Sequence, residues 1–420
     1  MTHNHLPTQT WERAQILDAL RGFALLGIAL ANFPEFALWT FLSPQEQAAL
    51  PLSGADRGVH FLLYLLVDGK FYTIFSLLFG VGFSLILARH SRMLFLRRML
   101  ILAAIGAAHL MMLWSGDILL LYAVCGMLLI GLAPLPDKWL LRIAVGMLIL
   151  PVGLDAIQEL THTDWAAPCY QAWWAEASRR GITEQNFASW LHDAHDYESI
   201  HAFLMQGAYE RMWEFVGGHR VPKVIGLFLL GYLIGKHRLY NRLHELPLKR
   251  VFRISLLVGA PTSILYAWSA THGHLLGSPT LHSLLYAVSV VPLAVAYICA
   301  LCLYSRSRQN PTLFAALCPA GRMALTCYLT QTLIGIALFY GVGLAWGTRL
   351  PLIMVEIIAA ATFLVQVACC RLWLRYFRFG PLEWLWRMLT YGRYFPLRNN
   401  AERAQLGQRT ECHTHTSIIM

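Results

Sequence analysis

The sequence predicts an all-α integral membrane protein, a polytopic bundle of about ten transmembrane helices. Hydrophobic residues make up 57% of the 420 residues and charged residues only 13%, whereas soluble domains carry roughly 25% charged residues. The apolar residues are gathered in runs of about 20, the length that crosses a bilayer as a helix. The basic residues lie mainly in the connections on one side of these runs, which is typical of cytoplasmic loops.

The predicted spans follow the apolar runs in chain order. They cover residues 20–42, 66–88, 98–114, 117–134, 139–156, 221–236, 254–271, 284–304, 323–346 and 351–373. Lysines and arginines cluster in alternate connections, whereas the short connections on the other side carry little beyond Arg57 and Arg349. The positive-inside rule makes the basic side cytoplasmic. Both termini are then expected in the cytoplasm.

The chain is expected to form one polytopic membrane domain over residues 1–398. Residues 157–220 form a long outer connection rich in His, Trp, Asp and Glu, which we interpret as an extracytoplasmic insertion. Its aromatic spacing indicates a helix that lies on the membrane, caps the bundle or is simply solvated. Residues 374–398 interleave tryptophans with arginines, which predicts an interfacial C-terminal helix. Residues 399–420 are polar and predicted to be a disordered tail.

Several features of the sequence suggest functions that we do not expect. The net charge of +10 does not indicate a nucleic-acid partner, because the basic residues lie between apolar runs rather than on one soluble face. Most of the nine cysteines lie in or beside apolar runs, and Cys299 and Cys302 have no second pair at metal spacing, so no metal site is expected. Residues 29–31 match a signal-cleavage pattern, but the run continues to Phe41, so the span is expected to be retained.

Polar side chains on the first span are candidate functional residues, because a charge at mid-membrane costs about 2.5–3.5 kcal/mol. Asp18, Arg21 and Asn32 lie on one face of a helix. Asp18 and Arg21 can pair at i, i+3 at the cytoplasmic mouth. Asn32 lies about 16 Å further toward the outer side. The alternative for Asn32 is a hydrogen bond that only joins two helices.

The third and fourth spans are predicted to form a tight hairpin, AAHLMMLWSGDILLLY, with Trp114 at the outer interface and Gly116 in the turn. His109 lies below the outer surface, and Asp117 can reach it across the hairpin. A histidine oriented by a carboxylate is the usual arrangement of a general base. Asp117 is also a good N-cap for the fourth span, and capping alone is the alternative explanation.

The second and ninth spans add four further candidates. Asp68 and Lys70 open the second span on either side of a predicted break at a glycine, where they cap the outer mouth or face a cavity. The ninth span contributes Arg322 and Gln331. Because the polar residues are concentrated in five spans and run from a basic mouth to an outer cluster, we predict a polar path across the bundle, with packing alone as the alternative.

Five segments carry a family resemblance: LDALRGFALLGIALAN, KFYTIFSLLFGVGFSL, AAHLMMLWSGDILLLYAVCGML, GRMALTCYLTQTLI and LRYFRFGPLEWLWR. They resemble the YeiB-like bacterial membrane proteins, the domain-of-unknown-function-418 family. The resemblance covers nearly the whole chain except the tail and much of residues 157–220. It implies a multi-pass protein of the bacterial cytoplasmic (inner) membrane.

The L-D-x-x-R-G opening at residues 17–22 is also remotely similar to the transmembrane acyltransferase clan. That clan includes the acyltransferase-3 O-acylating enzymes and the lysosomal heparan-glucosaminide N-acetyltransferase, and the resemblance implies transfer of an acyl group from coenzyme A inside to a sugar outside. In the pattern of the heparan enzyme an Asn lies ten residues after the R-G pair, and Asn32 matches it. A His in the next loop has no counterpart, since Ser43 stands near its place, and His109 is expected to serve instead.

Two functions follow from these residues. The first is an acyltransferase-like enzyme that moves an acyl group from a cytoplasmic donor to an extracytoplasmic hydroxyl or amine. The second is a small-solute transporter that uses the same path, with Asp68 or Glu356 relaying protons, although the two halves show no inverted repeat. A scaffold without turnover is a third possibility.

The enzyme hypothesis assigns a role to each candidate. The expected catalytic residues are His109 as base, Asp117 as its orienting acid and Asn32 as donor to the oxyanion. The expected substrate-binding residues are Asp18, Arg21, Asp68, Lys70, Arg322 and Gln331. Acyl-coenzyme A is expected as a co-substrate, without a tightly bound cofactor. The expected partners are membrane lipid and a small-molecule or sugar acceptor, and a homodimer is left open.

Overall fold

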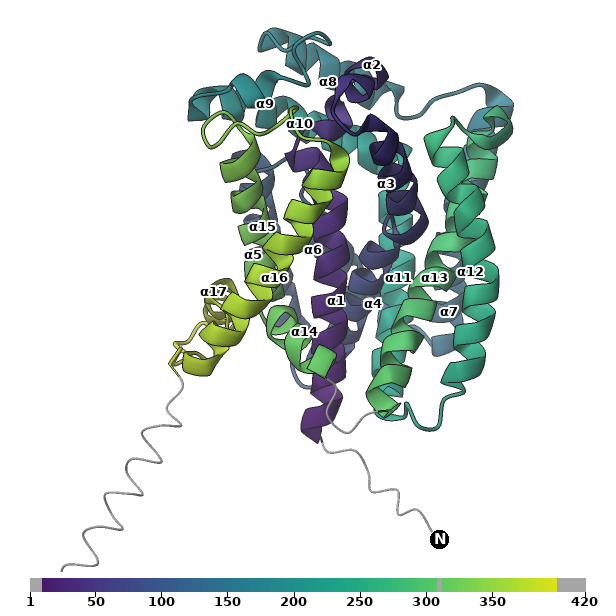
Figure 1. Cartoon of the computed structure of the whole chain (residues 1–420). Coiled ribbons are helices and arrows are strands. Elements are labelled where there is room, and N and C mark those ends of the chain that lie inside the picture. Colours follow the sequence, from purple (N-terminus) through teal and green to yellow (C-terminus); the bar gives the residue numbers. More distant parts are fainter. Residues whose placement is uncertain (1–9, 308–311, 399–420) are drawn as a thin grey trace, which may run out of the picture.

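The computed structural model describes residues 10–307 and 312–398, and the predicted tail at 399–420 lies outside them (Figure 1). Within the described residues the chain is helical, and the β-structure is one isolated bridge between Phe377 and Arg398. The helices are α1 (Thr10–Phe36), α2 (Pro44–Ala49), α3 (Ser53–Leu66), α4 (Lys70–Leu87), α5 (Arg92–Met112), α6 (Leu119–Leu132), α7 (Asp137–Thr161), α8 (Ala167–Arg179), α9 (Trp190–Asp193), α10 (Tyr197–Gly217), α11 (Arg220–Lys236), α12 (Leu248–Thr271), α13 (Pro279–Ser307), α14 (Thr312–Arg322), α15 (Ala324–Phe339), α16 (Leu352–Tyr376) and α17 (Pro381–Tyr391).

The described helices have the length and composition of a membrane protein. Seven candidate spans are long and apolar enough to cross a bilayer, and the bent pair of α14 and α15 makes an eighth. Helix α6 is apolar but shorter. The prediction of an all-helical membrane protein is therefore confirmed. The count of ten spans and the orientation of the termini stay predictions.

Helix α1 lies in the middle of the bundle and packs against α4, α14, α15 and α16 (Figure 1). A second group of helices, α7, α11, α12 and α13, packs beside it, joined to it mainly through α4. One end of the bundle is covered by α2 and by α8, α9 and α10, and we call this the cap end. The opposite end holds α14, α17 and the start of α1.

Residues 157–220 do not form a simple solvated loop. Helix α7 continues to Thr161, and α8, α9 and α10 then fold over the cap end. Helix α10 packs against α5, α8 and α11. The segment therefore caps the bundle and is neither a helix on the membrane surface nor a solvated loop.

Two predicted spans are broken. The second begins earlier than expected, as α3, and turns at Gly69, whose φ of 73° suits a residue without a side chain. The ninth is bent by 79° where α14 meets α15, and α15 ends at Phe339 rather than at residue 346. Arg322 therefore ends α14 and is separated by the bend from α15, which forms the predicted ninth span as far as Phe339.

Close helix contacts at glycines hold the bundle together. A Cβ added to Gly80 on α4 would lie 2.2 Å from the carbonyl oxygen of Phe228, and one added to Gly231 on α11 would lie 2.0 Å from that of Leu77. Helices in a membrane gain stability by such close backbone approach, because lipid supplies no hydrophobic drive between them. The α4–α11 contact depends on both residues.

Gly231→Ala is expected to reduce the free energy of unfolding by about 1–2 kcal/mol, because the methyl group separates α4 from α11. The measurement is the thermal unfolding midpoint in detergent, which should fall. Gly146→Ala on α7 is the matched control, since nothing lies within 4 Å of its added Cβ. Equal midpoints for the two variants would contradict the close contact.

Candidate functional site

A cavity of about 710 Å³ runs through the bundle beside α1. Its walls include Asp18 and Arg21 near the start of α1, and Asn32 and Glu35 near its end. Asp18 and Glu35 are about 25 Å apart along the helix axis. One cavity therefore reaches from the end opposite the cap to the cap itself. The predicted polar path across the bundle corresponds to this cavity.

The end opposite the cap is positively charged, and we call it the basic mouth. Its five lining arginines come from four helices and from the connection between α16 and α17: Arg21, Arg98, Arg322, Arg378 and Arg387. Two carboxylates, Asp18 and Glu383, lie among them. The charges do not cancel, so the basic mouth favours an anion.

The arginines of the basic mouth are held in place by neighbouring groups. Arg21 Nη1 donates to Asp18 Oδ1 at 2.6 Å, which confirms the predicted i, i+3 pair. Arg98 stacks over the Trp386 ring at 3.6 Å from its centroid. Arg322 donates to a backbone carbonyl at 3.2 Å. Each guanidinium has further N–H groups to offer a ligand, since Arg carries five.

Glu383, one of the two carboxylates of the basic mouth, is held by hydrogen bonds from α15. Its carboxylate accepts from Thr326 N at 3.0 Å and from Thr326 Oγ1 at 2.6 Å. Burial raises the pKa of Glu383, and these hydrogen bonds offset only part of the rise. Thr326 thus holds the Glu383 carboxylate in place at the edge of the basic mouth.

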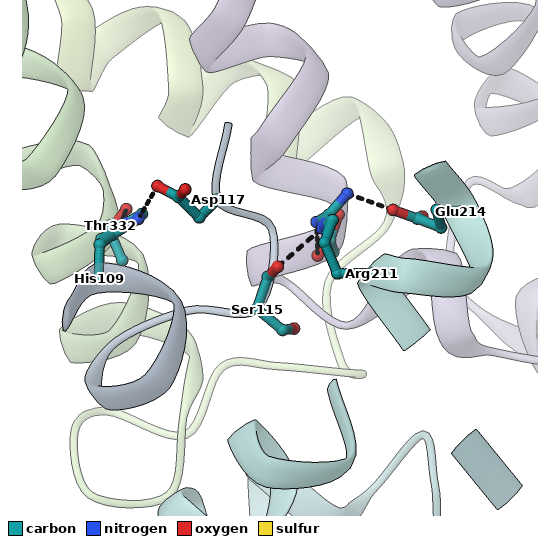
Figure 2. Close-up of polar contacts among 7 residues, drawn as sticks. His109, Ser115, Asp117, Arg211, Glu214 and Thr332 are labelled. Carbon is teal, nitrogen blue, oxygen red and sulfur yellow. Dashed lines mark hydrogen bonds and ion pairs between the residues drawn. The ribbon is translucent and has the colours of Figure 1, made fainter. Parts of the chain in front are cut away.

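The hairpin of α5 and α6 brings His109 and Asp117 together, as predicted (Figure 2). His109 Nδ1 lies 2.9 Å from Asp117 Oδ1, and both side chains are 1% exposed. A carboxylate only accepts, so Nδ1 carries the hydrogen, and Nε2 then accepts from Thr332 Oγ1 at 3.0 Å. Asp117 Oδ2 also accepts from Leu120 N at 2.8 Å, so it caps α6 as well.

Asp117 lines the cavity, whereas His109 stands behind it. Both ring nitrogens of His109 are engaged, and the ring packs against Trp114 and Tyr328. Trp114 is 3% exposed and lines the cavity, so its side chain faces the interior of the bundle, and its place at the outer interface stays a prediction. The geometry thus presents the Asp117 carboxylate to a ligand, with His109 holding it in place.

The cap closes the other end of the cavity with charged residues that the sequence reading missed. Arg211 on α10 donates through Nε to Ser115 O at 2.7 Å and pairs with Glu214 (Figure 2). Its Nη2 is 3.9 Å from Glu35 Oε1 on α1. Arg220, at the start of α11, also lines the cavity and lies over the Tyr72 ring at 5.8 Å.

We call this set the cap chamber; it consists of Glu35, Asp68, Asp117, Arg211, Glu214 and Arg220. The one sequence signal for its cap residues was ERMWEF, which places charges i, i+3 on an aromatic-rich helix. Such a pattern predicts a solvated face as readily as a buried one, so their position required the tertiary fold.

The structure brings most of the predicted site residues to one cavity. Its lining includes Asp18, Arg21, Asn32, Asp68, Asp117 and Arg322. Asp68 also accepts from Tyr266 Oη at 2.6 Å. This bond ties the cavity wall at Asp68 to α12, in the second group of helices.

Two predicted ligand-binding residues lie outside the cavity lining. Lys70 is fully buried and its Nζ donates to Tyr64 O at 2.5 Å, across the turn at Gly69. Gln331 on α15 donates to Gln366 Oε1 on α16 at 3.0 Å, which joins these two helices. Each contact gives the residue a packing role, and a role in substrate binding stays a prediction.

Glu356 on α16 is buried and does not line the cavity. Neither of its carboxylate oxygens has a hydrogen-bond partner among the described residues. In the same part of the chain, no group of three or more His, Cys, Asp or Glu side chains could hold a metal ion.

Comparison with known proteins places the chain among bacterial proteins of unknown activity. The family profile described as "Protein of unknown function (DUF418)" matches residues 234–393. The chain is 30% identical to "Uncharacterized protein YxaH" of Bacillus subtilis over 93% of this chain and 97% of that protein. It is 32% identical to "Uncharacterized protein YeiB" of Escherichia coli over 90% of this chain and 96% of that protein.

A third relative, "Uncharacterized 39.9 kDa protein in amylase 3'region" of Bacillus acidopullulyticus, is 29% identical over 92% of this chain and 96% of that protein. No solved structure matches the chain. The similarity to these relatives covers 90–93% of this chain, well beyond the profile region. The chain belongs to the YeiB-like DUF418 family of membrane proteins.

Proposed function

We propose that this protein is a membrane acyltransferase that moves an acyl group from an anionic donor at the basic mouth to a hydroxyl or amine acceptor at the cap chamber. The observation that carries the proposal is the single cavity that joins five arginines to a buried Asp117–His109 pair. Transfer across a membrane needs a donor site and an acceptor site on opposite faces with a path between them, and this cavity supplies all three.

The proposal places the chain in the bacterial inner membrane with ten spans and both termini in the cytoplasm. The seven candidate spans and the bent pair of α14 and α15 account for eight. Helices α6 and α11 bring the number to ten. The basic mouth then faces the cytoplasm, as the positive-inside rule requires, and the cap faces outward.

The basic mouth suits the phosphates of an acyl-coenzyme A. Guanidinium groups bind phosphate oxygens through paired, charge-assisted hydrogen bonds. Arg21 lies about 16 Å from Asn32 along α1, so the donor must carry its acyl group on an arm of that length. Coenzyme A has phosphates at one end and the thioester at the end of a long arm, which matches this arrangement.

The chemistry needs a proton acceptor beside the acyl carbon. In the proposed step the acceptor oxygen or nitrogen attacks the carbonyl carbon, the C–S bond breaks, and the proton passes to Asp117 and then to the leaving thiolate. His109 keeps the carboxylate oriented through its Nδ1–H. Asn32 lines the same cavity and donates to the oxyanion that forms during attack.

Purified protein in detergent is expected to hydrolyse acetyl-coenzyme A slowly, with water in place of the acceptor. Arg322→Gln is expected to raise the donor KM about tenfold, because it removes a charge-assisted bond to phosphate. The control is Arg250→Gln, an exposed position on α12 outside the cavity. Absence of turnover by the wild type, with any acyl donor and acceptor tried, would refute the proposal.

A small-solute permease is the second candidate, because the cavity reaches both ends of the bundle and contains Asp68 beside several cationic groups. A permease would import solute into reconstituted vesicles in a manner that depends on the proton gradient. Such uptake, together with no acyl turnover, would favour the permease over the enzyme.

A further inference from the structure

The wall of the cavity near Asp117 contains a tyrosine whose hydroxyl has no hydrogen-bond partner among the described residues. Tyr328 on α15 lines the cavity and is 6% exposed. Its hydroxyl makes no hydrogen bond within the described residues.

A neighbouring tyrosine shows what a structural hydroxyl looks like in the same wall. Tyr122 on α6 also lines the cavity, and its Oη is 2.6 Å from Ser76 Oγ. A buried polar group without a partner costs about 1–3 kcal/mol, so buried hydroxyls are nearly always bonded. Tyr72 and Tyr328 both line the cavity with hydroxyls that have no partner among the described residues, and Tyr328 is the one whose ring packs on His109.

The position of Tyr328 is fixed by the residues of the site. Its ring packs on the His109 ring with centroids 5.3 Å apart. Asp117 and Arg211 both lie within electrostatic range of its hydroxyl. A phenol carries its proton at neutral pH, so the group can donate a hydrogen bond without any change of state. The ring contact holds this donor still, which is what pre-organised stabilisation of charge requires.

We infer that the Tyr328 hydroxyl binds the carbonyl oxygen of the acyl donor and stabilises the oxyanion that forms on it. This inference rests on the proposed acyl transfer and adds a catalytic residue to it. Asp117 accepts the proton of the attacking group, while Tyr328 donates to the oxygen of the carbonyl under attack. Acyl transfer needs both: a proton acceptor for the attacking nucleophile and a hydrogen-bond donor for the carbonyl oxygen.

A hydrogen bond from Tyr328 to the oxyanion is consistent with the electrons and protons that move during the step. As the new bond to carbon forms, the carbonyl electrons move onto oxygen, and the hydrogen bond from Tyr328 strengthens as that charge grows. When the C–S bond breaks, the electrons return and the carbonyl is restored. Tyr328 keeps its proton throughout, so it makes no demand on the proton transfer through Asp117. Asn32 supplies the second donor.

Tyr328→Phe tests the inference, because it removes the hydroxyl and keeps the ring on His109. With acetyl-coenzyme A as substrate, kcat is expected to fall about tenfold while the donor KM stays unchanged, since the bond is strongest in the transition state. The melting temperature is expected to stay the same or to rise, because an unpaired buried hydroxyl is lost. Tyr232→Phe is the control, a buried tyrosine outside the cavity whose hydroxyl donates to Ala133 O at 3.4 Å.

The outcomes separate the inference from the proposed function. If the wild type turns over and Tyr328→Phe matches it in kcat, the inference alone is wrong. If the variant loses activity and also melts well below the control, Tyr328 is structural and the inference is again wrong. If the wild type shows no turnover, the proposed function fails and the inference fails with it.

Discussion

Asp117→Asn is expected to lower kcat for acetyl-coenzyme A turnover by about 10²- to 10⁴-fold, the largest effect of any single substitution in this chain. The substitution keeps the size of the side chain but removes its ability to take a proton. The amide can still accept one of the two hydrogen bonds that now come from His109 Nδ1 and Leu120 N. If the amide N–H faces His109, the ring adopts its other tautomer and donates through Nε2 to Thr332.

The expected result is therefore an inactive protein that still folds. The measurement is kcat together with the melting temperature in the same detergent. Asp137→Asn is the matched control, since Asp137 begins α7 outside the cavity and pairs with Lys236 at 2.5 Å. Normal turnover by Asp117→Asn would mean that the carboxylate is only a helix cap, the alternative that the sequence left open.

The polar stripe of α1 was predictable because it depends on one helix. Asp18, Arg21 and Asn32 are placed by helical periodicity alone, and all three line the cavity. The His109–Asp117 contact was predictable for a related reason, since a tight hairpin brings the two ends of a short segment together. Local geometry is enough in both cases.

The positions of Lys70 and Gln331 could not be read from spacing. The turn at Gly69, where φ is positive, separates α3 from α4, so the direction of Lys70 does not follow from the spacing of one continuous helix. The partner of Gln331 is Gln366, on another helix. Periodicity fixes a side chain only relative to its own helix, and these two outcomes depend on a turn and on a neighbour.

The order of polar groups along the cavity also argues against packing as their only purpose. Polar residues that only join helices bond to each other, as Gln331 Nε2 does to Gln366 Oε1. In the basic mouth five arginines face two carboxylates, so charge is left over for something else to neutralise. Repulsion among like charges destabilises a fold, and a site that retains it fits an anionic ligand.

Arg211→Leu is expected to destabilise the protein by about 3 kcal/mol, the largest stability effect predicted here. Arg211 is 14% exposed, and its side chain joins Ser115 O on the α5–α6 hairpin to Glu214 and approaches Glu35 on α1. Its loss leaves a carbonyl and two acids without their cation in a partly buried place. The value lies at the low end for a broken buried pair, because Glu35 and Glu214 keep some exposure to water.

The measurement is the unfolding midpoint in detergent, with Arg179→Leu as control, an exposed arginine on α8. A double variant, Arg211→Leu with Glu214→Leu, is expected to recover part of the loss, because it removes one of the stranded acids. Were α10 a solvated helix on the membrane surface, Arg211→Leu would behave like the control and the double variant would recover nothing. The cap would then be no wall of the cavity, and the acceptor end of the proposed enzyme would lose Arg211 and Arg220 from its lining.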